Sequence, residues 1–293
     1  MLALLLTAAA IAKPAVQPEK RTVELEIIVS VAGLPSDTPV NVYLPIAQDA
    51  ARQTVKRTDI NANIVGVAKT EPKYGNQYWH GQTDHAPDGT VTVNMVQRIE
   101  RSSAGRMTPT EAEKGLFVQA NSRVPISGTS VDKAISALGS NDGSPKGIAR
   151  SIYNMVIDTM DHKTGNCTDF NGLFASTARA KDIPTRFEVG YTIPIGQQAG
   201  TIEGHHCWVE TALPTLGWFP IDPYAADKDP EQKEALFGKQ PADRIELSVG
   251  RDLNLENLQS PPIDFFIDPH VEVDGKPWKD VSTTVTYRTP SPN

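Results

Sequence analysis

This chain contains only two cysteines, and they lie in segments of different character. Cys167 lies in GNCTDFNGLF, just ahead of a helical pattern, and Cys207 lies in GHHCWVE, beside two histidines. Unpaired N–H groups and the helix dipole lower the pKa of a thiol at a helix start, whereas burial alone raises it. Cys167 is therefore either an activated nucleophile or a small core residue, and its partner groups must decide between the two.

The segment that begins at Cys167 predicts a helix with clear ends. Gly165 interrupts the preceding pattern, and Pro184 ends the following one. Cys167 lies three residues before Phe170 and so begins the inward face of this helix. Small and apolar residues continue that face at helical spacing: Phe170, Leu173, Phe174, Thr177 and Ala178.

The histidine segment predicts a β-hairpin of residues 205–212 and 217–222, joined by LPTL. Symmetry about Pro214 places His206 opposite Asp222, and opposite residues share one face of a sheet. The same register gives two further pairs across the hairpin: Trp208 with Pro220, and Glu210 with Trp218. The alternate residues are apolar and are expected to face the core: Cys207, Val209, Phe219 and Ile221.

This alternation gives the two cysteines opposite roles. Cys207 is expected to be a packing residue, while Cys167 has His206 as its base and Asp222 to hold the imidazole in the right tautomer. Alternation also turns His205 away from the thiol, although a slip of one residue would put it in place of His206. A disulfide is the rival interpretation, but side chains on opposite sides of the strand cannot approach to bonding distance.

A metal site is a further alternative. Cys167, His205, His206 and Asp222 include side chains that zinc accepts as ligands. However, adjacent histidines on a strand point to opposite faces, so both cannot easily bind one ion. The expectation is an enzyme without a metal or cofactor.

Other side chains near these segments are weaker candidates. Arg186 in PTR is expected to brace the sheet or an acidic loop rather than to act in chemistry. Three aromatic residues are candidates for the walls of a substrate cleft, although core packing accounts equally well for the two tryptophans: Trp208, Trp218 and Tyr224.

The elements that precede the helices read as a separate β region. Residues 1–18 combine a short apolar run with an A-x-A site, which resembles a signal peptide and predicts a periplasmic or secreted protein. This run is too short to span a bilayer comfortably, so no integral membrane span remains once the signal is removed. Residues 19–105 show short strands of period two, which predict a small β-sandwich.

Residues 106–293 are expected to form the catalytic domain. Ser144 and Pro145 mark the start of a helix that precedes the cysteine helix. The sequence VEVDGKPW predicts a hairpin with Asp274-Gly275 as its turn, and VSTTVTY suits a last strand. We expect this tail to complete the catalytic sheet. The fold class is thus α+β, with the sandwich preceding a helix packed on an antiparallel sheet.

Charge limits the range of partners. The 293 residues include 28 basic and 35 acidic side chains, for a net charge of −7. This balance argues against nucleic acids and membrane surfaces as partners.

The segment from 145 to 225 resembles the transglutaminase-like superfamily, whose core is shared with papain-like thiol enzymes. The resemblance rests on GNCTDFNGLF, on DIPTRFEVGY, on HCWVE and on GWFPIDP, and the tail resembles bacterial exported members. It implies a Cys167–His206–Asp222 triad and selects His206 over His205, because His206 lies two residues before Trp208. The family usually has a small or β-branched residue at Cys207 and threonine at Tyr224.

The resulting expectation is a thiol-dependent acyl-transfer enzyme that acts on amide or peptide bonds through a thioester. The backbone N–H of Cys167 is a natural oxyanion donor. Hydrolysis of a peptide or protein is favoured over transamidation, and a cell-envelope polymer is one candidate substrate. The alternatives are a protein-glutamine transglutaminase that cross-links proteins, and a non-catalytic binding module with a degenerate enzyme core.

Overall fold

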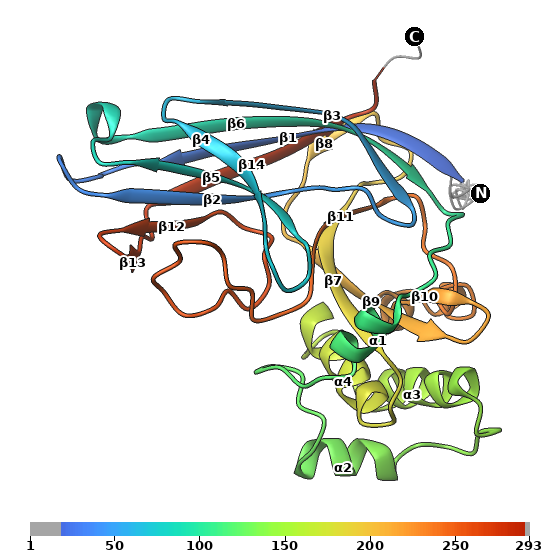
Figure 1. Ribbon diagram of the computed structural model, residues 1–293. Coiled ribbons are helices and arrows are strands. Elements are labelled where there is room, and N and C mark those ends of the chain that lie inside the picture. Colours follow the sequence, from blue (N-terminus) through green and yellow to red (C-terminus); the bar gives the residue numbers. More distant parts are fainter. Residues whose placement is uncertain (1–18, 291–293) are drawn as a thin grey trace, which may run out of the picture.

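A computed structural model describes residues 19–290, so the predicted signal peptide at residues 1–18 lies outside the described residues. Figure 1 shows a β-sandwich beside a smaller sheet that helices cover. All strand pairs are antiparallel. The molecule therefore has the predicted α+β class. One hydrophobic core runs from the sandwich into the helical layer.

The sandwich consists of two five-stranded sheets. The first sheet has, in spatial order, these strands: β3 (Gln53–Ala62), β6 (Val91–Ser102), β1 (Lys20–Val31), β14 (Val281–Arg288) and β8 (Ala199–Thr201). The second has these: β13 (Lys276–Pro277), β12 (His270–Val273), β2 (Val40–Ile46), β5 (Gln77–Thr83) and β4 (Gly66–Thr70). In β1, every second side chain from Val23 to Val29 is buried, as the period of two predicts.

The C-terminal strands belong to the sandwich, which corrects the expectation that the tail completes the catalytic sheet. The predicted hairpin forms as β12 and β13 around Asp274-Gly275. However, β12 pairs with β2, and β14 pairs with β1 over eight residues. A different strand, β11 (Arg244–Val249), already completes the third sheet, whereas β1 and β2 each need a second partner for their backbone groups.

The third sheet has the order β10-β9-β7-β11 and carries the helices. Its other strands are β7 (Thr185–Thr192), β9 (His206–Leu213) and β10 (Gly217–Ile221). The helices are α1 (Glu111–Phe117), α2 (Thr129–Ser136), α3 (Pro145–Thr159), α4 (Cys167–Arg179) and α5 (Pro223–Lys228), with short 3₁₀ turns η1 (Pro87–Gly89) and η2 (Pro230–Gln232). The α3 helix starts as predicted, because Ser144 caps it and Pro145 follows.

Buried polar contacts join the sandwich to the third sheet. Arg52, just before β3, forms an ion pair with Glu210 of β9. The Gln53 side chain exchanges two hydrogen bonds, of 2.9 and 3.0 Å, with the backbone of Glu246 in β11. Because removing one partner of a buried pair leaves the other uncompensated, these contacts fix the two parts against each other.

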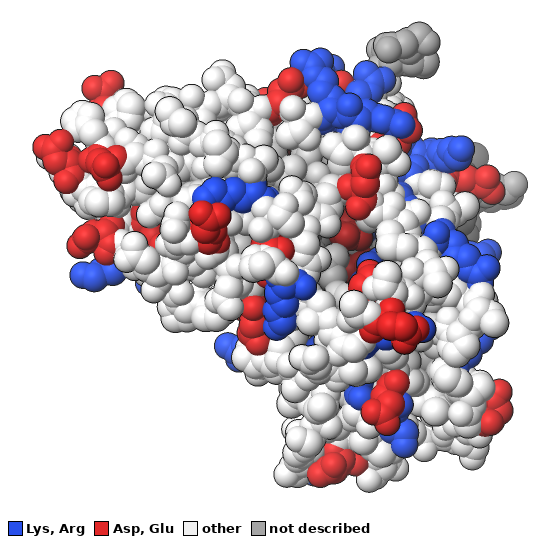
Figure 2. Space-filling model, viewed as in Figure 1, with Lys and Arg blue, Asp and Glu red and all other residues white. Residues whose placement is uncertain are grey.

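The visible surface carries charges of both signs. Figure 2 shows acidic and basic side chains interspersed on this face, in keeping with a modest net charge of −7. Within residues 19–290, no helix is both long and apolar enough to cross a membrane.

Candidate active site

The α4 helix starts at Cys167 because Asn166 caps it. The Asn166 side chain accepts hydrogen bonds from the backbone N–H groups of Thr168 and Asp169, at 2.8 and 3.2 Å. The Asp169 carboxylate in turn accepts the Asn166 N–H at 2.9 Å. This reciprocal capping box satisfies the first donors of the helix and fixes its start. Cys167 is thus the first helical residue, as predicted, and its side chain is only 6% exposed.

The hairpin has the predicted faces but a different register. Glu210 lies opposite Pro220, and Trp218 lies opposite Ala212, so the predicted symmetry about Pro214 is wrong. The axis lies one residue later, at Thr215, whose φ of 63° gives the turn its left-handed conformation. Moving the axis by one residue shifts each pair by two positions. The alternation of faces survives such a shift.

His206 and Asp222 therefore meet although they are not an opposed pair. The His206 Nε2 lies 2.7 Å from Asp222 Oδ2. The same oxygen accepts a hydrogen bond of 2.8 Å from Arg244 Nη2 of β11. The other oxygen, Oδ1, accepts the Ala225 N–H at 2.9 Å and so caps α5. Both oxygens of this buried carboxylate are engaged, which fixes its orientation toward the imidazole.

The charges of this group favour an imidazolium beside a carboxylate. Burial opposes ionisation of Asp222, but the positive charges of His206 and Arg244 outweigh it and lower the pKa of the carboxyl. Burial likewise opposes the charged form of His206, but Asp222 outweighs it and raises the pKa of the imidazole. Sequence reasoning missed Arg244, because an arginine within a strand of mixed pattern carries no recognisable signal.

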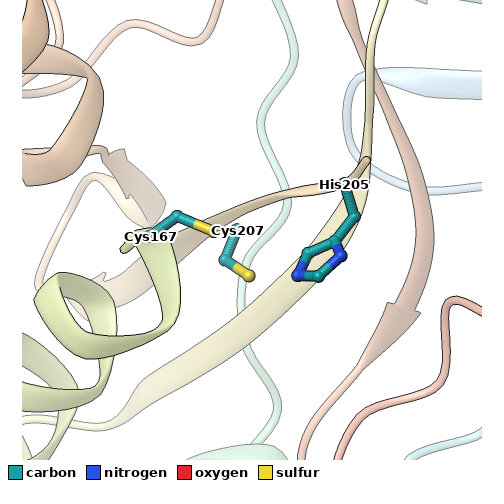
Figure 3. A group of neighbouring side chains, drawn as sticks. All are labelled: Cys167, His205 and Cys207. Carbon is teal, nitrogen blue, oxygen red and sulfur yellow. The ribbon is translucent and has the colours of Figure 1, made fainter. Parts of the chain in front are cut away.

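Cys207 and His205 both lie beside Cys167, which corrects two expectations. A ring nitrogen of His205 and the two cysteine sulfurs lie within 4.8 Å of one another. Figure 3 shows the His205 ring turned toward the Cys207 sulfur. Strand β9 begins only at His206, and Gly204 has a φ of 77°, so alternation does not govern the direction of His205. Both cysteines are free, as predicted, but they do not lie on opposite sides of a strand.

The start of α4 packs directly on β9, which explains how the two sulfurs meet. The Asn171 side chain donates hydrogen bonds to the backbone carbonyls of Cys167, at 2.8 Å, and of Cys207, at 2.9 Å. The Thr168 hydroxyl lies 3.6 Å from the Cys207 sulfur. Asn171 is fully buried and thus ties the cysteine of the helix to the cysteine of the strand.

The Cys167 thiol is strongly acidic in this setting. A hydrogen bond from the Cys207 thiol is the main cause, and hydrogen bonds from His205 and His206 add to it against the effect of burial. Together they lower the pKa of Cys167 to about 3. Burial instead raises the pKa of Cys207. At neutral pH, Cys167 is thus the thiolate of the pair, and Cys207 is a neutral donor.

A cleft of about 760 Å³ opens over this group. Cys167, His205 and Tyr224 line it, so the predicted role of Tyr224 as a cleft residue fits its position. Trp208 and Trp218 are each 1% exposed and pack inside the fold, so neither lines this cleft. The packing alternative describes both tryptophans.

Arg186 has the structural position that the sequence predicts. Its guanidinium pairs with Glu188 at 2.7 Å and with Glu210 at 2.5 Å. It also stacks on the Trp218 ring, with its carbon 4.7 Å from the ring centroid. The group lies inside the fold, with Arg186 7% exposed, so it braces the sheet.

The far wall of the cleft comes from a loop after β11 that sequence reasoning missed. Arg251 and Phe265 lie in this loop region, and a bidentate pair with Asp264 holds the arginine at 2.6 and 2.8 Å. The loop has no periodic pattern, so nothing in the sequence marked it as part of the site.

Two known proteins resemble this chain. One curated relative, an "Uncharacterized protein" of Haemophilus influenzae, is 29% identical over 39% of this chain, and the chain spans 39% of that relative's length. The crystal structure of a "Putative Cysteine Protease" from Cytophaga hutchinsonii matches with a TM-score of 0.57 and 12% identity. That match covers 93% of this chain and 99% of the other, and it supports the fold alone.

A family model also matches directly. The model of the Transglutaminase-like superfamily matches residues 98–223, a range that contains α4, β9, β10 and Asp222. The matched strands and helix are those that bring a thiol, an imidazole and a carboxylate together. Residues 98–223 therefore form a thiol-enzyme core of the transglutaminase-like superfamily, which confirms the resemblance seen in the sequence.

Proposed function

We propose that this protein is a cysteine hydrolase that cleaves amide or peptide bonds, with Cys167 as nucleophile, His206 as general base and acid, and Asp222 as the residue that positions His206. The observation that carries the proposal is the 2.7 Å contact between His206 and Asp222 beside an acidic thiol. That thiol lies at the floor of a cleft that substrate can enter.

The reaction starts from a thiolate and an imidazolium. The Cys167 sulfur attacks the carbonyl carbon, and the carbonyl oxygen becomes an oxyanion near the Cys167 backbone N–H, which has no acceptor within the helix at this first position. The imidazolium of His206 gives its proton to the departing amine as the C–N bond breaks. Asp222 stabilises the imidazolium throughout and is not itself protonated.

A thioester on Cys167 and a neutral imidazole remain. His206 then takes a proton from water, and the resulting hydroxide attacks the thioester carbon. The acid product leaves, and the thiolate–imidazolium pair returns. An amine in place of water would give transamidation and cross-linking, which is the first alternative activity.

Three observations support hydrolysis in particular. The cleft over Cys167 reaches solvent, so water can enter it. The structural neighbour is described as a cysteine protease. The signal-peptide pattern at residues 1–18 supports an exported enzyme, for which peptides, proteins or a cell-envelope polymer are the substrates within reach. A non-catalytic binding module is the second alternative.

A paired assay tests the proposal. The protein and its C167A variant are incubated with a mixture of internally quenched peptides, with and without a fluorescent primary amine. We expect new amino termini with the unaltered protein and none with C167A. Incorporation of the amine into intact glutamine side chains would favour the transglutaminase. Neither product, from a protein whose Cys167 still reacts with iodoacetamide, would favour the binding module.

A further inference from the structure

The mechanism uses Cys167 but leaves its two nearest sulfur and nitrogen neighbours without a role. Figure 3 shows Cys167 at the start of α4, Cys207 on β9 and His205 just before that strand, with their side chains gathered at one point. The two sulfurs and a ring nitrogen lie within 4.8 Å of one another. Two thiols and an imidazole at one point are the side chains that zinc selects in proteins.

The spacing fits a metal ion better than a disulfide. Zn–S bonds of about 2.3 Å at tetrahedral angles place two sulfur ligands roughly 3.8 Å apart. The sulfurs of Cys167 and Cys207, within 4.8 Å of each other, need to close by about 1 Å at most to reach that separation. A disulfide would require them to approach to about 2 Å. The present arrangement is therefore closer to a coordination site.

The three ligands also differ in mobility in a useful way. Cys207 is fully buried and is held beside Thr168, and Cys167 is fixed by the capped start of α4. His205 is exposed and precedes the strand, so its ring can turn onto an ion without disturbing the sheet. The cleft beside His205 gives access to the ion and to a water as fourth ligand.

We propose that Cys167, Cys207 and His205 form a binding site for Zn²⁺ or another thiophilic divalent cation. The Cys167 thiolate and the neutral His205 ring bind directly. The Cys207 thiol releases its proton to solvent as its sulfur bonds to the ion. Two thiolates and a dication then make a neutral group, which offsets the cost of ionising Cys207 in an apolar position.

The bound ion occupies the sulfur that the proposed reaction needs. If the proposed function holds, the cation is a reversible inhibitor that protects the nucleophile until a chelator or a lower metal concentration releases it. Metal binding itself does not depend on that activity, so the two ideas can be tested separately. Alkylation of Cys167 reports occupancy of its sulfur without any substrate.

The experiment titrates the metal-free protein with Co²⁺, whose bonds to thiolates absorb strongly in the near ultraviolet, and repeats the titration in competition with Zn²⁺. The variants are C207S and H205A, with H162A as a matched control. His162 belongs to a separate group, in which its ring contacts Asp227 at 2.6 Å and Asp161 lies close. A parallel titration uses Mg²⁺, which prefers oxygen ligands.

We expect one Co²⁺ per chain with thiolate absorption, and Zn²⁺ should slow alkylation of Cys167 at least tenfold while Mg²⁺ does not. Loss of a second-shell partner weakens metal sites about 10- to 100-fold, so C207S, which removes a direct ligand, should cost about 100-fold or more. H205A should weaken binding about tenfold or more on the same reasoning. H162A should bind as the unaltered protein does.

Three results would overturn the inference: no ion bound by the unaltered protein, equal affinity in C207S and the unaltered protein, or a loss confined to H162A. H205A keeps the test decisive if C207S proves unstable in thermal unfolding, because His205 is exposed. Peptide cleavage by a protein that binds no metal would leave the proposed function standing. Metal binding at this site without peptide cleavage would leave only the inference standing.

Discussion

Exchanging Asp222 for asparagine separates orientation of the imidazole from mere occupancy of the site. In the structure, Oδ2 faces both His206 and Arg244, while Oδ1 faces the Ala225 N–H. Asparagine has one acceptor oxygen where the carboxylate has two. Whichever way the amide turns, its NH₂ group must oppose at least one donor that the carboxylate satisfied.

The size of the effect follows from these contacts. In the serine-protease triad, the same exchange lowers kcat by about 10⁴, which is about 5.5 kcal/mol in activation free energy. Here the Arg244 charge also stays behind without its carboxylate and disfavours the imidazolium of His206. We therefore expect D222N to lower kcat for peptide cleavage by about 10⁴. The unsatisfied donor should lower the free energy of unfolding by about 1–3 kcal/mol.

The pH dependence has a definite sign. Asp222 raises the pKa of His206, so the imidazolium is present at low pH and is lost as pH rises through that raised value. Without the carboxylate, the loss moves to lower pH. The alkaline limb of the pH–rate profile should therefore shift toward acid in D222N.

Asp243 provides a matched control for this experiment. Its carboxylate also bonds Arg244, at 2.8 Å through Nη1, and it is equally buried. We expect D243N to keep kcat within about tenfold of the unaltered protein, since a neutral partner changes only one remote hydrogen bond. The reasoning is refuted if D243N and D222N lose the same activity, or if D222N stays within tenfold of the unaltered protein.

Three further predictions concern neighbouring residues. At pH 6, iodoacetamide should label Cys167 and leave Cys207 unlabelled, because the pKa of the first thiol is lowered and that of the second is raised; peptide mass spectrometry would contradict this with equal labelling. H205A should raise the pKa of Cys167 and so move the acid limit of its labelling to higher pH, and an unchanged limit would exclude contact between the two side chains. Gly190→Ala should lower the free energy of unfolding by about 3 kcal/mol in denaturant titrations, because the added carbon would lie 1.8 Å from the Ile245 carbonyl oxygen; an unchanged midpoint would contradict the packing of β7 on β11.

The faces of the hairpin could be predicted from the sequence, because they depend only on alternation. His206 and Asp222 stay on one face for any even shift of the register, so the error at Pro214 did not separate them. The start of α4 was also predictable, since Asn166 and Asp169 are local capping residues.

Nonlocal contacts were not predictable from the same patterns. The approach of Cys207 to Cys167 depends on how α4 lies on β9, and that packing is set by Asn171 from inside the fold. The direction of His205 depends on where β9 begins, which is fixed by pairing with β7 at Gly190. The partners of β12 and β14 depend on which sheets have free edges, and a strand pattern carries no address for its partner.

The pairing of β14 with β1 has a consequence for how the chain folds as it is made. By the end of β6, β1 has its partner on one side, but the strand that fills its other side arrives only with residues 281–288. Roughly 180 residues separate the two events, which at about 5–20 residues per second is roughly 10–40 s of synthesis. During that time the edge of the first sheet is a template for wrong partners. Contacts of such long sequence separation also slow the final step, so the sandwich is finished last although its sequence begins first.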